Sequence, residues 1–346
     1  MSVRELFPTA ASVLDHAIAQ RVFPGAVVEV GRATGAVATI VRGAQTYAPD
    51  APAAATNTVY DLASLTKVLA TTALMAGEVN SGRMRLNDRV RHWIPSWTGD
   101  ERQLVTMQDL LEHCSGLPAH RPYWEQRRGR ASFEMAICEE PLAYHPRTQS
   151  IYSDPGFMLL GFAIEHAAGA LLDRLFDEWR ARELGPGGEM AFGPPPPWTE
   201  RTAPTEDTAD DEQRRGVVHD ENCAALDGVA GHAGLFGTAA AVGACARWWM
   251  ASPSLATFVR KSATPGSSRA LGWDTMLPTS SCGSRLSPRA IGHTGFTGTS
   301  LWIDPEQDLY VVFLSNRVHP TRTGKGIQDA RRALHDAVVY DLASSR

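Results

Sequence analysis

The sequence predicts an α+β fold in which an antiparallel sheet is built from both ends of the chain and a mainly helical region is inserted between them. Short runs of β-branched and apolar residues occur near one end, at 26–30 and 37–41, and near the other, at 300–303 and 309–314. Helical periodicity and loops dominate the long stretch between these runs. We therefore expect the two ends to pair in one sheet that is flanked by the terminal helices.

The first elements follow from local patterns. Residues 9–20 place apolar side chains on one stripe, which is typical of an amphipathic helix, and Pro24-Gly25 breaks it. The runs at 26–30 and 37–41 are separated by a glycine-containing turn, so they predict a hairpin.

The last elements mirror the first. Residues 304–308 read Asp-Pro-Glu-Gln-Asp, which has the chemistry of a turn between two strands. An apolar stripe from Ile327 to Val338 then predicts a final amphipathic helix. We expect a single catalytic unit, with an α/β part at about 1–60 plus 265–346 and a helical insertion at about 61–264.

Composition limits the partners. The formal net charge of −5 argues against nucleic acid or an anionic membrane surface as the main partner. The sequence contains no run of 18 or more apolar residues, so it predicts no membrane span. Five scattered cysteines without metal-ligand spacing indicate free thiols, and the first residues lack the pattern of a secretory signal. We expect a cytoplasmic location, or a periplasmic one if this is a mature form. The sequence does not determine the oligomeric state.

The segment from Ser64 to Gly77 has a strong helical pattern with small and apolar residues on most faces, which predicts a buried helix. Lys67 lies three residues after Ser64, hence on the same face, one turn along. Burial and the positive end of the helix dipole favour a neutral amine, which could act as the base of a serine nucleophile. The alternative is that Ser64 caps the helix and Lys67 is a solvated charge. Only three of the 33 basic residues are lysines, which favours a role that arginine cannot fill.

Two further segments carry candidate chemistry. In Tyr152-Ser153-Asp154-Pro155, Asp154 is the expected N-cap of a helix, and the Tyr152 phenol could relay protons near the serine. In the segment 292–298, Gly-His-Thr-Gly-Phe-Thr-Gly, glycines allow close approach of a ligand, and the Phe296 N–H could join that of Ser64 in an oxyanion hole. The alternative interpretations are that Asp154 is only a helix cap, that Tyr152 is a packed aromatic ring, and that the segment 292–298 is a glycine-rich bulge.

Other signals are weaker. Residues 219–222, His-Asp-Glu-Asn, with His232 nearby, lack the ligand spacing of a zinc site and are expected to form a polar loop near the site. The Gly-x-Ser-x-Gly frame, the P-loop and the Gly-x-Gly-x-x-Gly motif are absent from the sequence. We therefore expect no metal and no cofactor.

Taken in order, these segments resemble the serine β-lactamase and penicillin-binding protein superfamily, above all its class C branch. Ser-Leu-Thr-Lys at 64–67 is similar to its Ser-x-x-Lys motif, Tyr-Ser-Asp at 152–154 to Tyr-x-Asn, and His-Thr-Gly at 293–295 to Lys-Thr-Gly. The resemblance implies that Ser64 is acylated and that Lys67 and Tyr152 share the proton transfers. It implies further that the substrate is bound by residues of the second and third motifs: Asp154, His293, Thr294, Gly295 and Phe296.

Two departures from the family pattern bear on the substrate. Asp154 replaces an amide, and His293 replaces a lysine that commonly helps to bind the carboxylate of a β-lactam. Both changes make the site less positive, so we expect neutral esters or cationic D-amino compounds to be preferred to anionic β-lactams.

The sequence therefore predicts a serine hydrolase that forms an acyl-enzyme on a small-molecule ester, amide or β-lactam-like substrate. An esterase or a hydrolase of D-amino-acid amides or peptides is the leading hypothesis. Acyl transfer to another acceptor and true β-lactamase activity stay open, as does a non-catalytic penicillin-binding or scaffold protein on the same fold.

Overall fold

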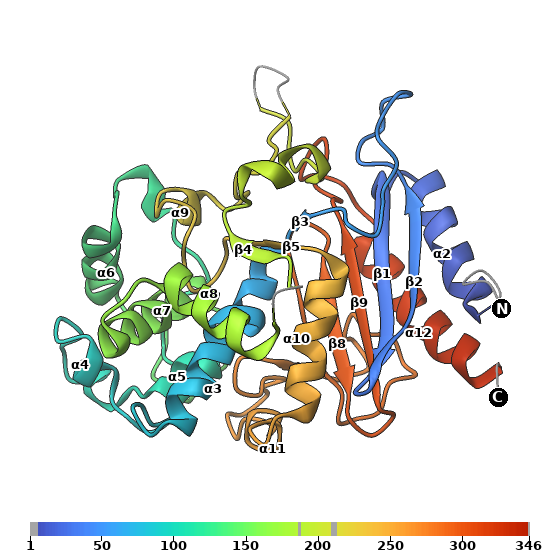
Figure 1. Cartoon of the computed structure of the whole chain (residues 1–346). Helices are drawn as coiled ribbons and strands as arrows, with labels where there is room; N and C mark the ends of the chain where they lie inside the picture. The colour runs from blue at the N-terminus through green and yellow to red at the C-terminus, as the bar shows by residue number, and fades with distance from the viewer. Residues whose placement is uncertain (1–5, 186–187, 209–212, 345–346) are drawn as a thin grey trace.

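The computed structural model describes residues 6–185, 188–208 and 213–344. Its main sheet is antiparallel, with the strand order β2-β1-β9-β8-β7-β6 (Figure 1). β1 pairs with β9, where Val28 lies opposite Phe313, so the two ends of the chain meet in the sheet, as the sequence predicts. The strands are β1 (Gly25–Arg32), β2 (Gly35–Gly43), β6 (Asp274–Thr275), β7 (Ile291–Thr294), β8 (Ser300–Asp304) and β9 (Leu309–Ser315).

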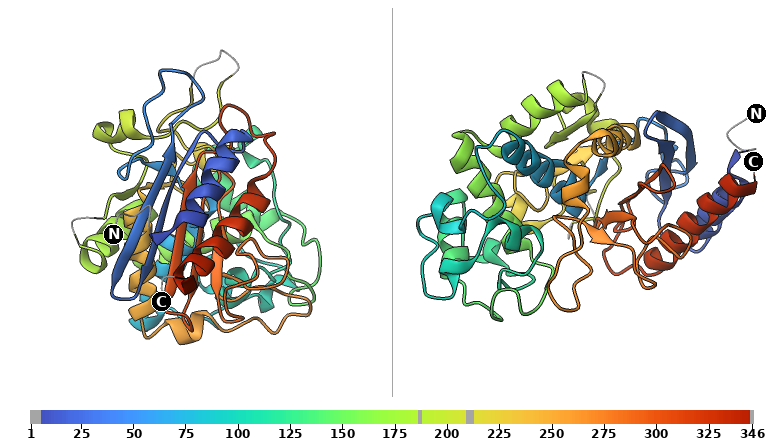
Figure 2. Two further views of the ribbon diagram at one scale, coloured as in Figure 1. Left: turned by 90° about the vertical axis from the view of Figure 1, so that its right-hand side faces the viewer. Right: turned by 90° about the horizontal axis from the view of Figure 1, so that it is seen from below.

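The terminal helices cover one face of this sheet. α2 (Pro8–Ala19) and α12 (Ile327–Ser344) lie side by side on it (Figure 2), and the Asp341 carboxylate accepts a hydrogen bond of 3.0 Å from the Thr9 N–H. Neighbouring residues of β1 point to opposite faces: Val28 joins the core beneath these helices, whereas Val27 joins the core on the other side. The sheet is therefore buried on both faces.

The inserted region packs against the second face. α10 lies against β1, β8 and β9, and α7 forms the centre of the helical part, in contact with α3, α4, α5, α6 and α8. The helices of this region are α3 (Thr72–Asn80), α4 (Val90–Trp93), α5 (Met107–Leu111), α6 (Arg130–Glu139), α7 (Asp154–Ala168), α8 (Leu172–Glu183), α9 (Glu221–Ala224), α10 (Ala239–Ala251) and α11 (Leu255–Phe258). Within the described ranges, no single helix is long and apolar enough to cross a membrane; α7 and α8 meet that test only as a pair bent by 75°.

A second, small sheet in the order β3-β5-β4 lies beside the start of the helical region. Its strands are β3 (Tyr60–Asp61), β4 (Met190–Phe192) and β5 (Leu235–Gly237). The sequence does not predict it, because strands of two or three residues are too short to show an alternating pattern. Its position matters, since β3 leads directly into Ser64.

Candidate active site

Ser64 lies in a tight turn rather than at the start of a regular helix. Ala63–Leu65 form a 3₁₀ turn, Lys67–Thr71 form a π-helical turn, and only from Thr72 does the segment become the α-helix α3. The expectation of one regular helix is therefore wrong over its first two turns. π-helical turns are frequent at functional sites, and their sequences carry no recognisable periodicity of their own.

The turn before Ser64 is held by a buried carboxylate. Ala63 has φ +48°, a left-handed conformation that costs an alanine about 1–2 kcal/mol. Its N–H donates to Asp61 Oδ1 at 2.8 Å, and Asp61 Oδ2 accepts from the His219 N–H at 2.7 Å. Asp61 thus fixes the strained turn that presents the serine, a role that its sequence context did not reveal.

Lys67 is completely buried, and its ammonium group has three acceptors. Nζ lies 3.0 Å from Ser64 Oγ, 2.8 Å from Asp154 Oδ1 and 3.2 Å from the His232 carbonyl oxygen. Burial lowers the pKa of Lys67, but the Asp154 carboxylate and the Tyr152 phenol outweigh it, so the pKa is raised above its ordinary value. The expectation that burial makes this amine neutral is wrong, because it did not include Asp154, 87 residues away in the sequence.

Asp154 is the ion-pair partner of Lys67 and does not cap α7. The N-cap is Ser153, whose Oγ accepts from the Gly156 N–H at 3.1 Å and donates to the Pro118 carbonyl at 2.7 Å. Burial raises the pKa of Asp154, but the effects of Lys67 and His120 outweigh burial, so the pKa is lowered overall. The carboxyl is therefore ionised at neutral pH. The expectation of Asp154 as the cap is therefore corrected to Ser153.

Tyr152 completes the group around the serine. Its ring packs against His113 and His293, with centroid separations of 4.7 and 5.8 Å, and Lys67 Nζ lies 4.7 Å from its centroid. Burial raises the pKa of Tyr152, and the charge of Lys67 and hydrogen bonds from Lys67 and Ser64 offset it only in part. The phenol is therefore protonated at neutral pH.

The third motif lies on β7 and in the turn after it. His293 is buried, and its Nδ1 lies 2.9 Å from the Thr294 carbonyl oxygen, which can only accept, so Nδ1 carries the proton. Burial, Lys67 and Arg269 hold the pKa of His293 well below its usual range, so the ring is neutral. Gly295 is required by close packing: a Cβ there would lie 2.1 Å from Thr299 Oγ1.

Phe296 lies at the rim. Its side chain is 51% exposed, stacks on His219 at 5.7 Å between centroids and has the Arg317 guanidinium 4.3 Å from its centroid on the ring face. Its N–H donates to no acceptor in the described part of the chain.

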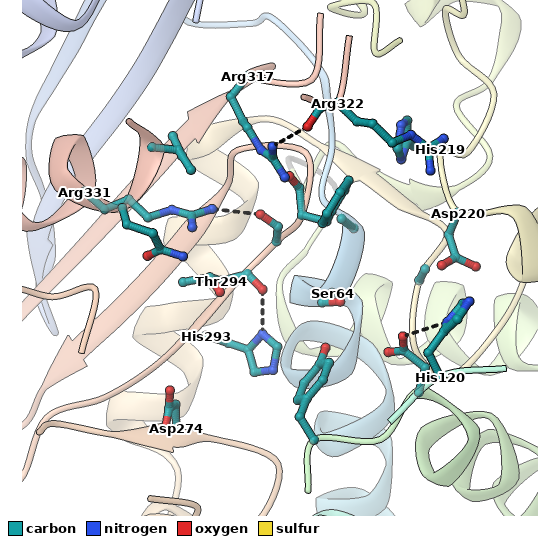
Figure 3. Close-up of a pocket in the computed structure, with 18 of the residues that line it drawn as sticks. Ser64, His120, His219, Asp220, Asp274, His293, Thr294, Arg317, Arg322 and Arg331 are labelled. Atoms are coloured by element: carbon teal, nitrogen blue, oxygen red, sulfur yellow. Dashed lines mark hydrogen bonds and ion pairs between the residues drawn. The ribbon is translucent and has the colours of Figure 1, made fainter. Parts of the chain in front are cut away.

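These groups line one cavity of ≈ 500 Å³ between the edge of the sheet and the helical region (Figure 3). Ser64, Tyr152, Asp154 and the residues 293–296 all contribute to its wall, so the three sequence motifs converge on one site. His219, Asp220 and Glu221 form part of the same wall. His232 Nε2 pairs with Asp220 Oδ1 at 2.8 Å, and no group of three potential metal ligands is found among the described residues.

The cavity also contains four arginines that the sequence analysis missed: Arg269, Arg317, Arg322 and Arg331. Arg269 lies 3.9 Å from Asp274, and Arg322 pairs with Glu206 and Glu221. Arg317 and the buried Arg331 have no carboxylate within 4.0 Å in the described chain. The cavity wall therefore contains cations that the motifs lack, together with the carboxylates of Asp154, Asp220, Glu221 and Asp274. These residues could not be singled out from the sequence, because arginine is common in this chain and they lie outside the motifs.

Arg331 extends from α12 behind the third motif. It donates to the carbonyl oxygens of Gly295 and Thr299 at 2.7 and 2.8 Å, while its buried Nε has no hydrogen-bond partner in the described residues. Burial lowers the pKa of Arg331 to about 9, which still leaves it charged at neutral pH.

A serine in contact with a buried lysine, beside a tyrosine and facing a Thr-Gly strand, on a sheet with an inserted helical region, defines a serine hydrolase of the Ser–Lys type. The chain belongs to the beta-lactamase family, whose model matches residues 11–336.

Relatives and solved structures agree with this assignment. A protein of Escherichia coli (strain K12) named "Putative D-alanyl-D-alanine carboxypeptidase" is 32% identical over 315 residues, covering 77% of this chain and 70% of the relative. A protein of the same name from Salmonella gallinarum is 33% identical over 313 residues, covering 77% and 71%.

Two solved structures have the same fold. "EstCE1, a hydrolase with promiscuous acyltransferase activity" is 20% identical, with a TM-score of 0.78 over 98% of this chain and 99% of that one. A class C beta-lactamase from Rhodobacter sphaeroides is 19% identical, with a TM-score of 0.76 over 97% of this chain and 99% of that one.

Proposed function

We propose that Ser64 is the nucleophile of an acyl-transfer reaction, with Lys67 as its base and Tyr152 as a proton carrier. The contact of 3.0 Å between Ser64 Oγ and Lys67 Nζ is the observation that carries this proposal. The Ser64 proton passes to the Lys67 amine while Oγ bonds to the substrate carbonyl carbon. Tyr152, in contact with both groups, donates its phenol proton to the leaving group and takes the proton held by Lys67 in its place, so that Lys67 is again a free amine. The N–H groups of Ser64 and Phe296 are the proposed oxyanion donors.

After the leaving group departs, the acyl group remains on Oγ. Water then attacks the ester carbonyl and gives a proton to the Lys67 amine, and Lys67 passes that proton to Ser64 Oγ as the product acid leaves. Such an exchange of proton carriers between the two half-reactions needs groups close to the serine: Lys67 contacts Ser64 Oγ, and Tyr152 lines the cavity beside Lys67. The contact between an intact serine and lysine favours an enzyme over a non-catalytic scaffold.

The proposed substrate is a small peptide that ends in a D-amino acid with a free carboxylate. Arg317 and Arg331 are cavity cations with no carboxylate partner among the described residues, and they support recognition of an anion. The relatives named as D-alanyl-D-alanine carboxypeptidases support the same class. This revises the preference for neutral or cationic substrates that the motifs alone suggested.

The test compares an N-acetylated peptide ending in D-Ala-D-Ala as the free acid with the same peptide as the C-terminal amide. A charge-assisted hydrogen bond contributes about 1.5–3 kcal/mol, so kcat/KM for the acid should exceed that for the amide roughly ten- to hundredfold. Arg317→Gln should lower the ratio of kcat/KM for the acid to that for the amide. Arg260 is an exposed arginine outside the cavity, so Arg260→Gln should leave this ratio unchanged. An amide cleaved as fast as the acid would contradict the proposed substrate class.

Ester hydrolysis, or acyl transfer to an acceptor other than water, is the second candidate. The half-exposed Phe296 offers an apolar surface at the rim for an acyl chain. Turnover of p-nitrophenyl butyrate with a higher kcat/KM than either peptide would favour this candidate.

A further inference from the structure

A continuous line of polar groups runs from the serine to solvent. Ser64 Oγ lies 3.0 Å from Lys67 Nζ, which lies 2.8 Å from Asp154 Oδ1. Asp154 Oδ2 in turn lies 3.8 Å from Nδ1 of His120, which stands at the cavity edge (Figure 3). The exposed fraction of the side chains rises along this line from 0% for Lys67 to 18% for Asp154 and 52% for His120. Asp154 is thus placed between two bases, one buried and one in contact with water.

This arrangement addresses a difficulty in the resting site. An ammonium group cannot accept the serine proton, and Lys67 has no exposed surface through which to lose its own. Loss of that proton alone would also leave the largely buried Asp154 carboxylate without its partner, which is unfavourable. A second cation that can pair with the same carboxylate removes this penalty.

We propose that His120 is a positioning residue for the catalytic base. In its protonated form it pairs with the Asp154 carboxylate in place of Lys67, which then becomes a free amine. This inference rests on the proposed role of Lys67. The proton balance is closed, since an N–H bond breaks at Lys67 and an N–H bond forms at neutral His120. Amine and imidazolium replace ammonium and imidazole, Asp154 stays ionised, and the net charge of the three groups is unchanged.

The charges around His120 fit this role. The interaction with the Asp154 carboxylate 3.8 Å away raises the pKa of His120, burial lowers it, and the negative charges of Asp220 and Glu221 raise it, with a net increase. The other two histidines of the cavity wall, His219 and His293, have a lowered pKa because of burial. Of the three, His120 is the one whose surroundings favour the charged form.

The groups that face Lys67 and Asp154 from neighbouring elements do not replace His120. His113 and His293 pack near Lys67, and burial keeps the pKa of both well below the usual range. His232 lies near Asp154, but its Nε2 is already paired with Asp220. Tyr152 is held as the protonated phenol, and Arg269, on its ring face, is a permanent cation.

The experiment measures kcat/KM against pH for the wild type, His120→Gln and His120→Ala. We expect the acid limb of both variants to move to higher pH by at least about one unit, which is a loss of about tenfold at neutral pH. The deficit should disappear at alkaline pH, where Lys67 is a free amine with or without His120. His145→Gln is the matched control, since His145 is an exposed histidine that pairs with Glu101 outside the cavity, and its profile should equal that of the wild type.

Two results would overturn the proposal: an unchanged acid limb, or a loss of equal size at every pH, which would indicate a binding role instead. Labelling of Ser64 by a fluorophosphonate at alkaline pH distinguishes a failure of the proposed role of His120 from a failure of the proposed role of Ser64. His120→Gln should label there like the wild type, whereas a wild type that never labels at Ser64 would remove the proposed function itself.

Discussion

At the scale of single residues, the chemistry of Lys67 depends on its ability to lose a proton. Its ammonium is held by Ser64, Asp154 and a backbone carbonyl, and the Asp154 carboxylate keeps its pKa raised. The residue at this position must therefore be able to exist both as a cation and as a free base. Arginine fulfils only the first requirement, because it stays charged at any pH used for proteins.

We therefore predict that Lys67→Arg is nearly as damaging as Lys67→Ala. A general base contributes about a hundred- to ten-thousandfold in rate, so both variants should lose kcat/KM by an amount in that range. The measurement is steady-state kinetics on one substrate for the wild type and both variants, with circular dichroism as the control for folding. If kcat/KM of the arginine variant were within a few-fold of that of the wild type, Lys67 would supply only charge.

At the scale of elements, the pair of Lys67 and Asp154 joins the π-helical turn after Ser64 to the first residue of α7. The pKa of Asp154 is lowered from 3.8 and that of Lys67 is raised from 10.5. The stabilisation from Asp154 is therefore present above pH 3.8 and is lost as the pH falls below it. The stabilisation from Lys67 is present below pH 10.5 and is lost as the pH rises above it.

Asp154→Asn should accordingly destabilise the protein at pH 7 by about 3–5 kcal/mol, because it leaves a buried cation unpaired. The difference from the wild type should shrink below pH 3.8 and above pH 10.5, and urea unfolding across this range measures it. The control is Asp177→Asn, which removes an exposed partner 3.5 Å from Arg180 and should cost no more than about 1 kcal/mol. Equal effects of the two variants would mean that the buried pair does not couple these elements.

The elements themselves were predictable to different degrees. The terminal helices and the strands at 25–43 and 300–315 were found because each carries a periodic pattern several residues long. The sequence predicts regular helix from Ser64, where the structure has 3₁₀ and π turns up to Thr71, because 3₁₀, π and α segments have similar residue preferences and differ in hydrogen bonding. The N-cap of α7 was assigned to Asp154 instead of Ser153, one residue too late, since both side chains can cap a helix.

At the scale of the whole molecule, the fold brings together three short motifs from positions 64–67, 152–154 and 293–296. Their residues could be found from the sequence because each motif combines reactive side chains within three or four positions. His120 and the four cavity arginines could not, because each is a single residue of an unremarkable type that reaches the cavity only through tertiary packing.

The central claim is that Ser64 carries the acyl group, and intact-mass spectrometry with peptide mapping after reaction with a fluorophosphonate tests it most directly. The wild type should gain one phosphonyl group per chain, located on Ser64. Ser64→Ala, shown to be folded by its circular dichroism and Tm, should gain none. An adduct on another residue, or labelling of Ser64→Ala with unchanged stoichiometry, would contradict the account.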